Sequence, residues 1–425
     1  MDALREIVPV TKPVQGSIRP PGSKSLTNRA LICAALSNGR STLTGSLDSD
    51  DTRVMVRALR SLGIAIDADW SEATLNVDGC GGVLPVQNAT LDLDGSGTSI
   101  RFLTALAATG TSVITLDGNP RMRERPIGQL AEALRQCGAK IETQGEFPPV
   151  VVHADRLSGA NISLRGDISS QYLSALLLAA PAACGAMEFM VEGEQVSQPY
   201  IAMTCAVMDA FGVDVEQVDN RRFRVTPKCY KSRIYEIEPD ASAASYFWAA
   251  AAITGGRVRV DGLTRESLQG DVAFCDYLQR MGCGLEFDTS GTTVIGKSLT
   301  GIDVDMAAIS DTVQTLATVA LFAEGPTTIR GVAHIRHKES DRIGDLAREL
   351  RKLGAIIEET DDGLCIHPQP FRGARIETYN DHRMAMSLAI AGLRIPGIQI
   401  ADPDCTAKTY PDFFGDLESL AGMAH

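Results

Sequence analysis

Lysine, arginine and hydroxyl side chains gather near the start of the chain, where residues 21–31 read PGSKSLTNRAL. The proline and glycine end an extended segment, and Ser23 or Ser25 is placed to cap the apolar helix that follows. Free N–H groups at a helix N-terminus attract anions, and Lys24 and Arg29 add positive charge to them. The stretch predicts a phosphate or carboxylate site, although a capped helix with two surface cations fits it equally well.

Five further predicted helix starts are compared with this one. They are the glycine-rich turn 94–101 with Gly97, the hydroxyl-rich 167–172 with Ser169, Ser170 and Gln171, then 240–244, 309–314 with Asp311, and 379–386 with Arg383. The glycines let backbone amides approach a ligand closely, whereas the start at 240–244 has no cation and is interpreted as structural. The start at 309–314 places a carboxylate where the others place donors.

Three other segments carry clustered charge. Residues 119–126 hold three arginines including Arg125, residues 337–342 hold Lys338, Glu339 and Arg342, and residues 405–411 hold Lys408. Lys338 and Arg342 are four residues apart, which puts them on one face if the segment is helical. Each segment alone fits a solvated charged surface. Together, cations at several helix starts, one carboxylate and a Lys–Glu pair predict a catalytic site for doubly negative small molecules.

A repeat of about 70 residues positions these segments. A glycine follows the small, apolar first helix of each copy, and another ends the amphipathic second helix. The first set is Gly39, Gly110, Gly185, Gly256, Gly325 and Gly397, and the second is Gly63, Gly138, Gly212, Gly282 and Gly354. Two predicted strands follow each second helix. The unit is βαβαββ or a permutation of it, so the fold class is α/β.

The first helices are apolar on all sides, as in residues 245–253, which predicts that they lie inside with the sheets outside. We therefore expect a two-lobed, inside-out α/β barrel of six repeats, three per lobe. The N-terminal lobe is expected at residues 20–239, and the C-terminal lobe at 240–425 completed by a strand from residues 1–19. Two such lobes would leave a cleft for substrates.

Composition narrows the classes of function. The chain has 425 residues, 44% hydrophobic and 22% charged, and a formal charge of −13, which disfavours nucleic acid and anionic membranes as partners. No apolar run reaches membrane-spanning length, and residues 1–6 do not have the pattern expected of a signal peptide. The ten cysteines are scattered without a Cys-x-x-Cys pair, and the six histidines lack an HExxH spacing. We expect a cytoplasmic monomer with free thiols, no metal and no cofactor.

In the ordered set of its motifs, the sequence resembles the 5-enolpyruvylshikimate-3-phosphate synthases, a family of enolpyruvyl transferases. The matching stretches are PGSKSLTNRAL, GSGTSIR, RMRERPIG, SSQYLSALL, KESDRIGDLARELRKLGA, YNDHRMAM and CTAKTYPDFF, between residues 21 and 414. The resemblance implies two lobes of six βαβαββ units. It also implies transfer of the enolpyruvyl group of phosphoenolpyruvate to the 5-hydroxyl of shikimate 3-phosphate, with release of phosphate, in the shikimate pathway.

The resemblance also implies roles for residues. Shikimate 3-phosphate would contact Lys24, Ser25, Arg29, Ser169, Ser170, Gln171, Ser197, Asp311, His334 and Lys338. Phosphoenolpyruvate would contact Lys24, Gly97, Arg125, Gln171, Arg342, Arg383 and Lys408. Asp311 would accept the proton of the 5-hydroxyl, Lys338 and Glu339 would lie near the acceptor and the C3 methylene, and Lys24 would join them as a catalytic group. No metal or cofactor is implied.

The chemistry accounts for this set. The enol ether carbon becomes electrophilic when C3 is protonated, so an acid must lie near C3 while a base takes the hydroxyl proton. Glu339 and Asp311 are the candidates, and the sequence leaves open which residue protonates C3. A tetrahedral intermediate then loses a C3 proton as phosphate leaves. Arginines bind carboxylate and phosphate through two hydrogen bonds, and lysines act as point charges.

Three positions depart from the common pattern of the family. Gly95, Phe102 and His334 stand where many members have Asn, Pro and Asn. His334 weakens the assignment of that position to shikimate, although an imidazole also donates hydrogen bonds. Glyphosate, an analogue that competes at the phosphoenolpyruvate site, is expected to bind because Gly97 keeps the loop free of a side chain.

Two alternative functions are weighed. A transferase that acts on UDP-N-acetylglucosamine shares the fold, but its family has a cysteine in the loop matching 119–126, and this chain has none there. A non-enzymatic repeat scaffold would explain the periodicity but not the clustered Arg, Lys and Asp at the helix starts. An RNA-end-processing enzyme with the same repeat fits poorly with the net charge of −13.

Overall fold

Two compact units make up the computed structural model, which describes residues 3–193 and 195–422. The N-terminal unit is Gly22–Ile237, and the C-terminal unit joins the residues up to Pro21 with those from Glu238 onward. Each unit has its own hydrophobic core and three sheets. The fold is the six-repeat α/β architecture expected from the glycine spacing, with five four-stranded sheets and one three-stranded sheet in the described part of the chain.

The five four-stranded sheets share one strand order. The first strand of a repeat runs parallel to the second, and the third and fourth follow as an antiparallel hairpin beside the second. The sheets of the N-terminal unit are β6 (Asn88–Asp92), β7 (Val113–Asp117), β9 (Phe147–His153), β8 (Lys140–Gln144); β10 (Asn161–Arg165), β11 (Met187–Glu192), β13 (Arg222–Val225), β12 (Glu216–Gln217); and β14 (Ile234–Glu236), β3 (Asn38–Thr44), β5 (Thr74–Cys80), β4 (Ala65–Asp69).

Two sheets of the C-terminal unit repeat this order and the third has three strands, and two of the unit's strands come from the start of the chain. Its sheets are β2 (Gln15–Ile18), β15 (Arg257–Asp261), β17 (Gly291–Ile295), β16 (Gly284–Phe287); β18 (Asp303–Asp305), β19 (Thr327–Arg330), β21 (Gly363–His367), β20 (Ile356–Thr360); and β22 (Arg375–Ile376), β23 (Ile398–Ala401), β1 (Leu4–Ile7). β2 pairs in parallel with β15, and β1 pairs antiparallel with β23. The chain thus gives this unit two strands before it enters the N-terminal unit.

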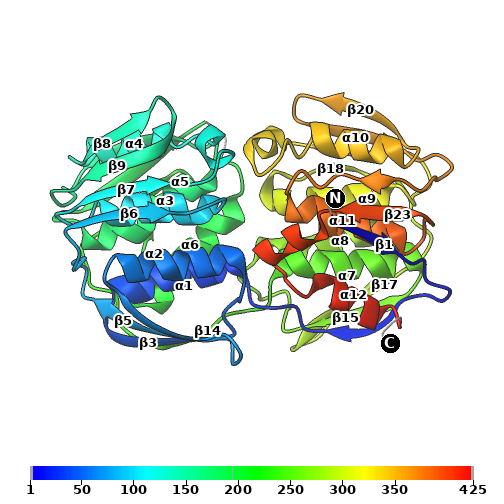
Figure 1. Ribbon diagram of the computed structural model, residues 1–425, viewed down its shortest axis with the longest axis horizontal. Coiled ribbons are helices and arrows are strands. Elements are labelled where there is room, and N and C mark those ends of the chain that lie inside the picture. The colour runs from blue at the N-terminus through cyan, green and yellow to red at the C-terminus, as the bar shows by residue number, and fades with distance from the viewer. Residues whose placement is uncertain (1–2, 194, 423–425) are drawn as a thin grey trace. The chain divides into compact units, whose positions relative to one another are not determined.

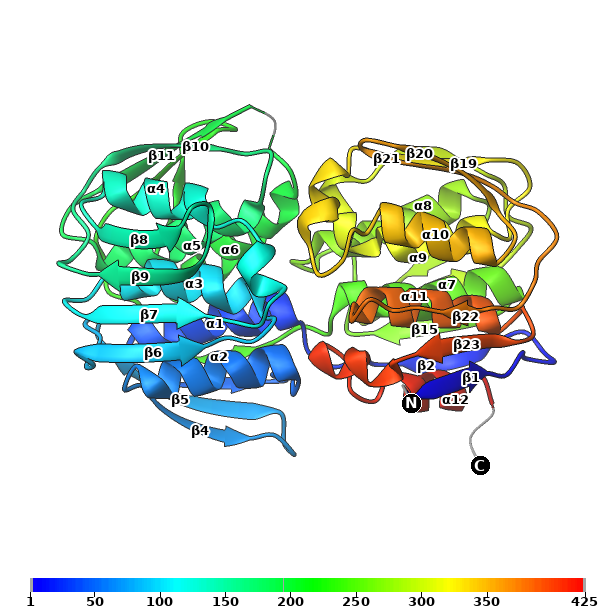
Figure 2. The same cartoon turned by 45° about the horizontal axis from the view of Figure 1, so that its top comes forward.

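The first helix of each repeat lies inside its unit. These are α1 (Lys24–Leu36), α3 (Gly97–Ala107) and α5 (Ser170–Ala179) in the N-terminal unit, and α7 (Ala241–Thr254), α9 (Val313–Ala320) and α11 (His382–Gly392) in the C-terminal unit. Every residue of α7 is buried, as its uniformly small and apolar sequence predicts. Figures 1 and 2 show α7, α9 and α11 between the sheet of β15 and the sheet of β18 to β20.

The second helices of the repeats are α2 (Asp50–Ser61), α4 (Gly128–Gln136), α6 (Gln198–Ala210), α8 (Phe274–Arg280), α10 (Gly344–Lys352) and α12 (Phe413–Leu420). Except for α6, the second helix of each repeat is shorter or more amphipathic than the first. Gly63 and Gly282, after α2 and α8, have φ of 86° and 116°, a region that glycine enters without steric cost. Within the described residues, no helix combines the length and the apolar character needed to cross a bilayer.

Candidate active site

Asp311 is the centre of a charged cluster in the C-terminal unit. It lies in a 3-10 turn (Ala307–Thr312) that leads into α9, and its carboxylate accepts hydrogen bonds from three cations. Lys338 Nζ bonds Oδ1, Arg342 Nη1 lies 3.2 Å from Oδ1, and Arg383 Nη2 lies 2.8 Å from Oδ2. Burial opposes ionisation, but Arg383, Lys338 and Arg342 hold the pKa of Asp311 well below its ordinary value.

Arg342 joins Asp311 to two more carboxylates and is itself 1% exposed. Its Nη2 donates to Glu339 Oε2 at 2.9 Å, and its Nε and Nη2 donate to the two oxygens of Asp381 at 2.7 and 3.0 Å. Burial lowers the pKa of Arg342, but Asp381, Glu339 and Asp311 outweigh it and raise that pKa. Lys408 Nζ lies 3.2 Å from Glu339 Oε1 and completes the cluster.

The backbone explains how these side chains meet. Arg383 is in the first turn of α11, whose N-cap Asp381 accepts from the Arg383 N–H, so one carboxylate caps the helix and holds Arg342. The segment that holds Lys338 and Arg342 is not helical, so the shared helix face that was conditional on a helix does not form: the 3-10 turn Ala333–His337 ends before them and α10 begins only at Gly344. Both side chains still reach Asp311, from a non-helical loop.

His334 lies beside this cluster. Its Nε2 is 3.0 Å from Ser310 Oγ, next to Asp311 in the chain. Burial and the charge of Lys338 lower the pKa of His334 to about 3. The imidazole is therefore neutral at physiological pH and offers one donor and one acceptor.

Gly97 and Arg125 form a close contact in the N-terminal unit. Gly97 begins α3, and a Cβ built on it would lie 2.5 Å from Arg125 Nη2 and 2.6 Å from its Cζ. Arg125 Nη1 also lies 3.4 Å from the carbonyl oxygen of Gly95. The guanidinium therefore lies against bare backbone at a helix N-terminus, where an anion would be attracted by both.

Gln171 lies next to the same helix start. It is in the first turn of α5, where the N-cap Ser169 accepts from its backbone N–H at 3.3 Å and Ser170 is the first helical residue. Gln171 Oε1 accepts from Arg101 Nη1 at 2.6 Å, and its Nε2 lies 3.4 Å from Thr98 Oγ1. The first turns of α3 and α5 are thus joined through Gln171.

Lys24 and Arg29 are both on α1 but have different surroundings. Lys24 Nζ lies 3.2 Å from Asp51 Oδ2 and its side chain is 12% exposed. Arg29 is buried, donates to Thr204 Oγ1 at 2.7 Å and to the Ser25 carbonyl at 2.9 Å, and burial lowers its pKa to about 10. Phe102 is buried on α3 with its ring centroid 5.3 Å from the Arg29 guanidinium carbon. Arg29 is largely occupied by internal contacts.

Ser197 begins α6 with a backbone that serine seldom adopts. Its φ of 55° and ψ of 41° are left-handed, and it is 7% exposed. Such strain is typical of functional positions.

In the C-terminal unit the structure joins six predicted residues in one cluster: Asp311, Lys338, Glu339, Arg342, Arg383 and Lys408. In the N-terminal unit it brings Arg125 against Gly97 and places Ser169, Ser170 and Gln171 together at the start of α5. Three partners of predicted residues were not themselves predicted: Asp51 beside Lys24, Asp381 beside Arg342, and Arg101 beside Gln171. Asp381 and Arg101 lie inside the motifs quoted above, and a search for anions near every predicted cation would have found Asp381. Asp51 stands in the charge-rich start of α2, where nothing in the sequence sets it apart from Asp50.

The fold and the clusters define a class of protein, the enolpyruvyl transferases of six βαβαββ repeats. Comparison with known proteins gives the family. The family model for EPSP synthase (3-phosphoshikimate 1-carboxyvinyltransferase) matches residues 8–417. A 3-phosphoshikimate 1-carboxyvinyltransferase of Trichormus variabilis is 48% identical over 427 residues, covering 100% of both chains. One of Shewanella baltica is 46% identical, covering 96% of this chain and 97% of its own.

Solved structures agree with this result. An EPSP synthase from Acinetobacter baumannii has a TM-score of 0.83 at 27% identity and covers 99% of this chain and 98% of its own. The chain belongs to the EPSP synthase family. Its activity is the transfer of the enolpyruvyl group of phosphoenolpyruvate to shikimate 3-phosphate, a step of the shikimate pathway that supplies aromatic amino acids. The UDP-sugar transferase and scaffold alternatives are set aside by these matches.

Proposed function

We propose that the charged cluster of the C-terminal unit and the predicted residues of the N-terminal unit bind the two anionic substrates and that Asp311 is the base of the reaction. In the C-terminal unit, Arg342, Arg383 and Lys408 are assigned to phosphoenolpyruvate, and Asp311, His334 and Lys338 to shikimate 3-phosphate. In the N-terminal unit, Gly97 and Arg125 are assigned to phosphoenolpyruvate, Ser25, Arg29, Ser169, Ser170 and Ser197 to shikimate 3-phosphate, and Lys24 and Gln171 to both. The observation that carries the proposal is the contact of Asp311 with three cations.

These contacts make Asp311 a poor base until substrate binds. Arg383 and Arg342 lower its pKa, and both are assigned to the carboxylate and phosphate of phosphoenolpyruvate. An anionic substrate that takes hydrogen bonds from these arginines weakens their hold on Asp311 and raises its pKa. The base becomes effective when the substrate is in place.

The reaction then runs in two steps. Asp311 takes the proton of the 5-hydroxyl, the 5-oxygen of shikimate 3-phosphate bonds to C2 of phosphoenolpyruvate, and C3 gains a proton, which gives a tetrahedral intermediate. Loss of a C3 proton re-forms the double bond as the C2–O bond to phosphate breaks. Glu339, whose carboxylate lies between Arg342 and Lys408, is the assigned acid at C3. Lys338 and Lys24 provide charge for the developing oxyanions.

A phosphate-release assay with both substrates tests the assignment. Asp311→Ala and Lys24→Met are expected to lose at least about 100-fold in kcat/KM, the usual contribution of a proton acceptor or an electrostatic group. Asp303→Ala is the matched control, because Asp303 pairs with Arg330 on the surface of the same unit. Full activity in both Asp311→Ala and Lys24→Met would reject the site.

Glyphosate is proposed to compete with phosphoenolpyruvate at Gly97 and Arg125. Gly97→Ala is expected to raise both the inhibition constant for glyphosate and the KM for phosphoenolpyruvate, because the new Cβ would meet the Arg125 guanidinium at about 2.5 Å. Gly110→Ala is the control, since its Cβ would have no neighbour closer than 3.4 Å. Inhibition that is not competitive with phosphoenolpyruvate, or an unchanged KM in Gly97→Ala, would contradict the proposal.

The chain is also proposed to act as a cytoplasmic monomer. Its ten cysteines are free thiols, which fits a reducing compartment. Light scattering of the purified protein tests the monomer, and fractionation of the source cells tests the location.

A further inference from the structure

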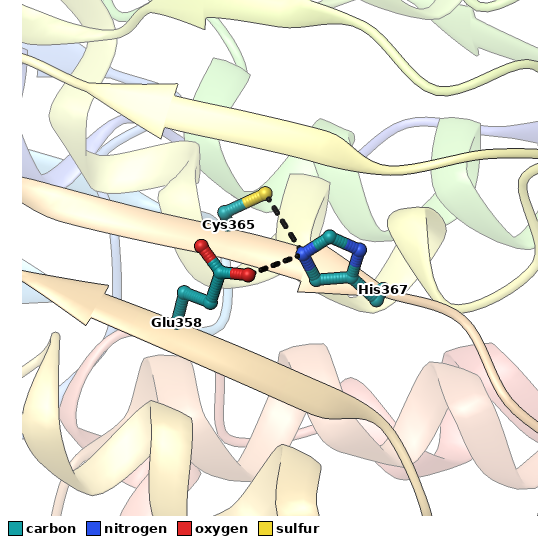
Figure 3. Close-up of side chains that lie close together, drawn as sticks. All are labelled: Glu358, Cys365 and His367. Carbon is teal, nitrogen blue, oxygen red and sulfur yellow. Dashed lines mark hydrogen bonds and ion pairs between the residues drawn. The ribbon is translucent and has the colours of Figure 1, made fainter.

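One face of the sheet β18-β19-β21-β20 carries three side chains of metal-binding type, Glu358, Cys365 and His367 (Figure 3). Cys365 and His367 are two residues apart on β21, so they point to the same side of the sheet. Glu358 on β20 lies directly opposite Cys365 in the antiparallel register. The backbone of a regular hairpin therefore holds all three.

Their donor atoms converge on one place. His367 Nε2 lies 3.4 Å from Cys365 Sγ and 3.1 Å from Glu358 Oε1, and the three donor atoms lie within 4.8 Å of one another. Hydrogen bonding explains this convergence of the three donor atoms only in part. One ring nitrogen carries at most one hydrogen, yet it faces a sulfur and a carboxylate oxygen at once. A cation accepts electron pairs from all three atoms.

The spacing fits a zinc ion. Zn–S bonds of about 2.3 Å and Zn–N and Zn–O bonds of about 2.0–2.1 Å at tetrahedral angles place S and N roughly 3.6 Å apart and N and O roughly 3.4 Å apart. The observed 3.4 and 3.1 Å differ from these by a few tenths of an ångström. Thr328 on β19 directs its hydroxyl at Cys365 Sγ, 3.4 Å away, and a donor there favours the thiolate that a metal requires.

We propose that Glu358, Cys365 and His367 bind a Zn²⁺ ion, with water as the fourth ligand. The mixed S, N and O ligands suit a borderline-soft cation and not Mg²⁺. Glu358 is 70% exposed and His367 35%, so solvent reaches the ion. The proposal departs from the expectation of no metal, which was based on HExxH and Cys-x-x-Cys spacings. Cross-strand pairing creates a site that neither spacing reveals.

The second repeat provides an internal comparison. On the equivalent sheet, His153 Nε2 lies 3.2 Å from Glu142 Oε1 with nearly the same exposure, 34% and 61%. Val151 lies opposite Glu142 and Thr115 on the neighbouring strands. Cys365 lies opposite Glu358 and Thr328 in the same way. The two sites differ chiefly in having valine or cysteine at the central position. The thiol therefore distinguishes the zinc site from an ordinary Glu–His pair.

The test exchanges cysteine and valine at positions 365 and 151 in the full chain. Metal-free protein is titrated with Zn²⁺ against a chromogenic chelator for the parent, Cys365→Val and Val151→Cys. We expect Cys365→Val to bind one equivalent less than the parent and Val151→Cys to bind one more. With Co²⁺ as the probe, thiolate-to-cobalt absorption should appear in the parent and disappear in Cys365→Val. His367→Gln should weaken Zn²⁺ binding at least tenfold. This second variant tests the same site if Cys365→Val does not fold.

Other thiols of the chain will also take up zinc, so the difference between variants is decisive. Equal zinc uptake by the parent and Cys365→Val would overturn the proposal, as would a Val151→Cys protein that gains no site. A parent whose bound Zn²⁺ is displaced by equimolar Mg²⁺ would overturn the assignment of metal class. Phosphate-release activity is expected to be equal in all variants, because none of these residues belongs to the proposed active site.

Discussion

Three carboxylates share the guanidinium of Arg342, and this places a fully buried cation where an anionic substrate is expected to bind. Of the three, Asp381 is wholly buried and bonds both Nε and Nη2. Asp311 and Glu339 each face other cations as well. Asp381 therefore fixes the position of Arg342 and leaves the other two carboxylates for chemistry.

Asp381→Asn tests this division of roles. The variant removes the charge of Asp381 while Asp311 and Glu339 remain beside Arg342, so we expect a loss of about 1.5–3 kcal/mol in the free energy of unfolding of the C-terminal unit, and a higher KM for phosphoenolpyruvate. Denaturant unfolding and steady-state kinetics measure these effects. Asp303→Asn, whose pair with Arg330 is exposed, should cost only about 0–1 kcal/mol. Equal losses in the two variants would contradict the role of Asp381.

His334 makes a pH-dependent contribution to stability. Its pKa falls from 6.5 to about 3 on folding, so the unfolded chain binds a proton at a pH where the folded chain does not. The contribution is complete above about pH 6.5 and is lost as the pH falls toward the folded value. Between about pH 7.5 and pH 5, the Tm of the parent should therefore fall more than that of His334→Asn. Scanning calorimetry across this range measures the difference, and parallel curves would refute the buried neutral imidazole.

At the scale of elements, many of the assigned residues lie at helix starts, and the backbone of Ser197 at the start of α6 is strained. Ser197→Gly should relieve the left-handed backbone at the start of α6 and raise stability by up to about 1 kcal/mol, while the lost hydroxyl raises the KM for shikimate 3-phosphate. Ser197→Ala separates the two effects, because it removes the hydroxyl and keeps the strain. We therefore expect a higher KM for shikimate 3-phosphate in both variants, and a higher Tm only in Ser197→Gly. A Tm in Ser197→Gly no higher than in Ser197→Ala would show that the strain is small.

The sequence predicted the helices that have a strong apolar pattern. It predicted less well the segments whose conformation is set by hydrogen bonds in a loop. The all-apolar run of 245–253 predicted the buried α7, and the glycines fixed the ends of the second helices. The spacing of Lys338 and Arg342 suited a helix face without showing that the segment is helical, and the hydrogen bonds that Asp341 accepts from the Ile343 and Gly344 N–H groups hold a turn there. Side-chain capping of this kind competes with helix and is hard to see in spacing.

At the scale of the molecule, one sheet in each unit is completed by a strand that lies far along the chain from the strand it pairs with. β14 joins the N-terminal unit beside β3 after three repeats have passed, and β2 joins the C-terminal unit beside β15 before any repeat has begun. The repeat period predicted six copies, and it suggested that an N-terminal strand completes the C-terminal half. It did not predict that β1 and β2 enter two different sheets, because short edge strands carry little hydrophobic pattern.

Closure of the C-terminal unit by β2 depends on close packing at Gly256. A Cβ on Gly256 would lie 1.9 Å from the carbonyl oxygen of Val14, which accepts from the Arg257 N–H at the start of the β2–β15 ladder. Gly256→Ala must therefore push the strand away, at a cost above the usual 1–3 kcal/mol of overpacking. Its neighbour Gly255 has no atom within 4 Å of the added Cβ but has φ of 70°, so Gly255→Asn is the control and should cost about 1 kcal/mol or less. In limited proteolysis, Gly256→Ala should expose the C-terminal unit to cleavage and leave Gly22–Ile237 resistant. Equal resistance of both units in the variant would mean that β2 is not needed for closure.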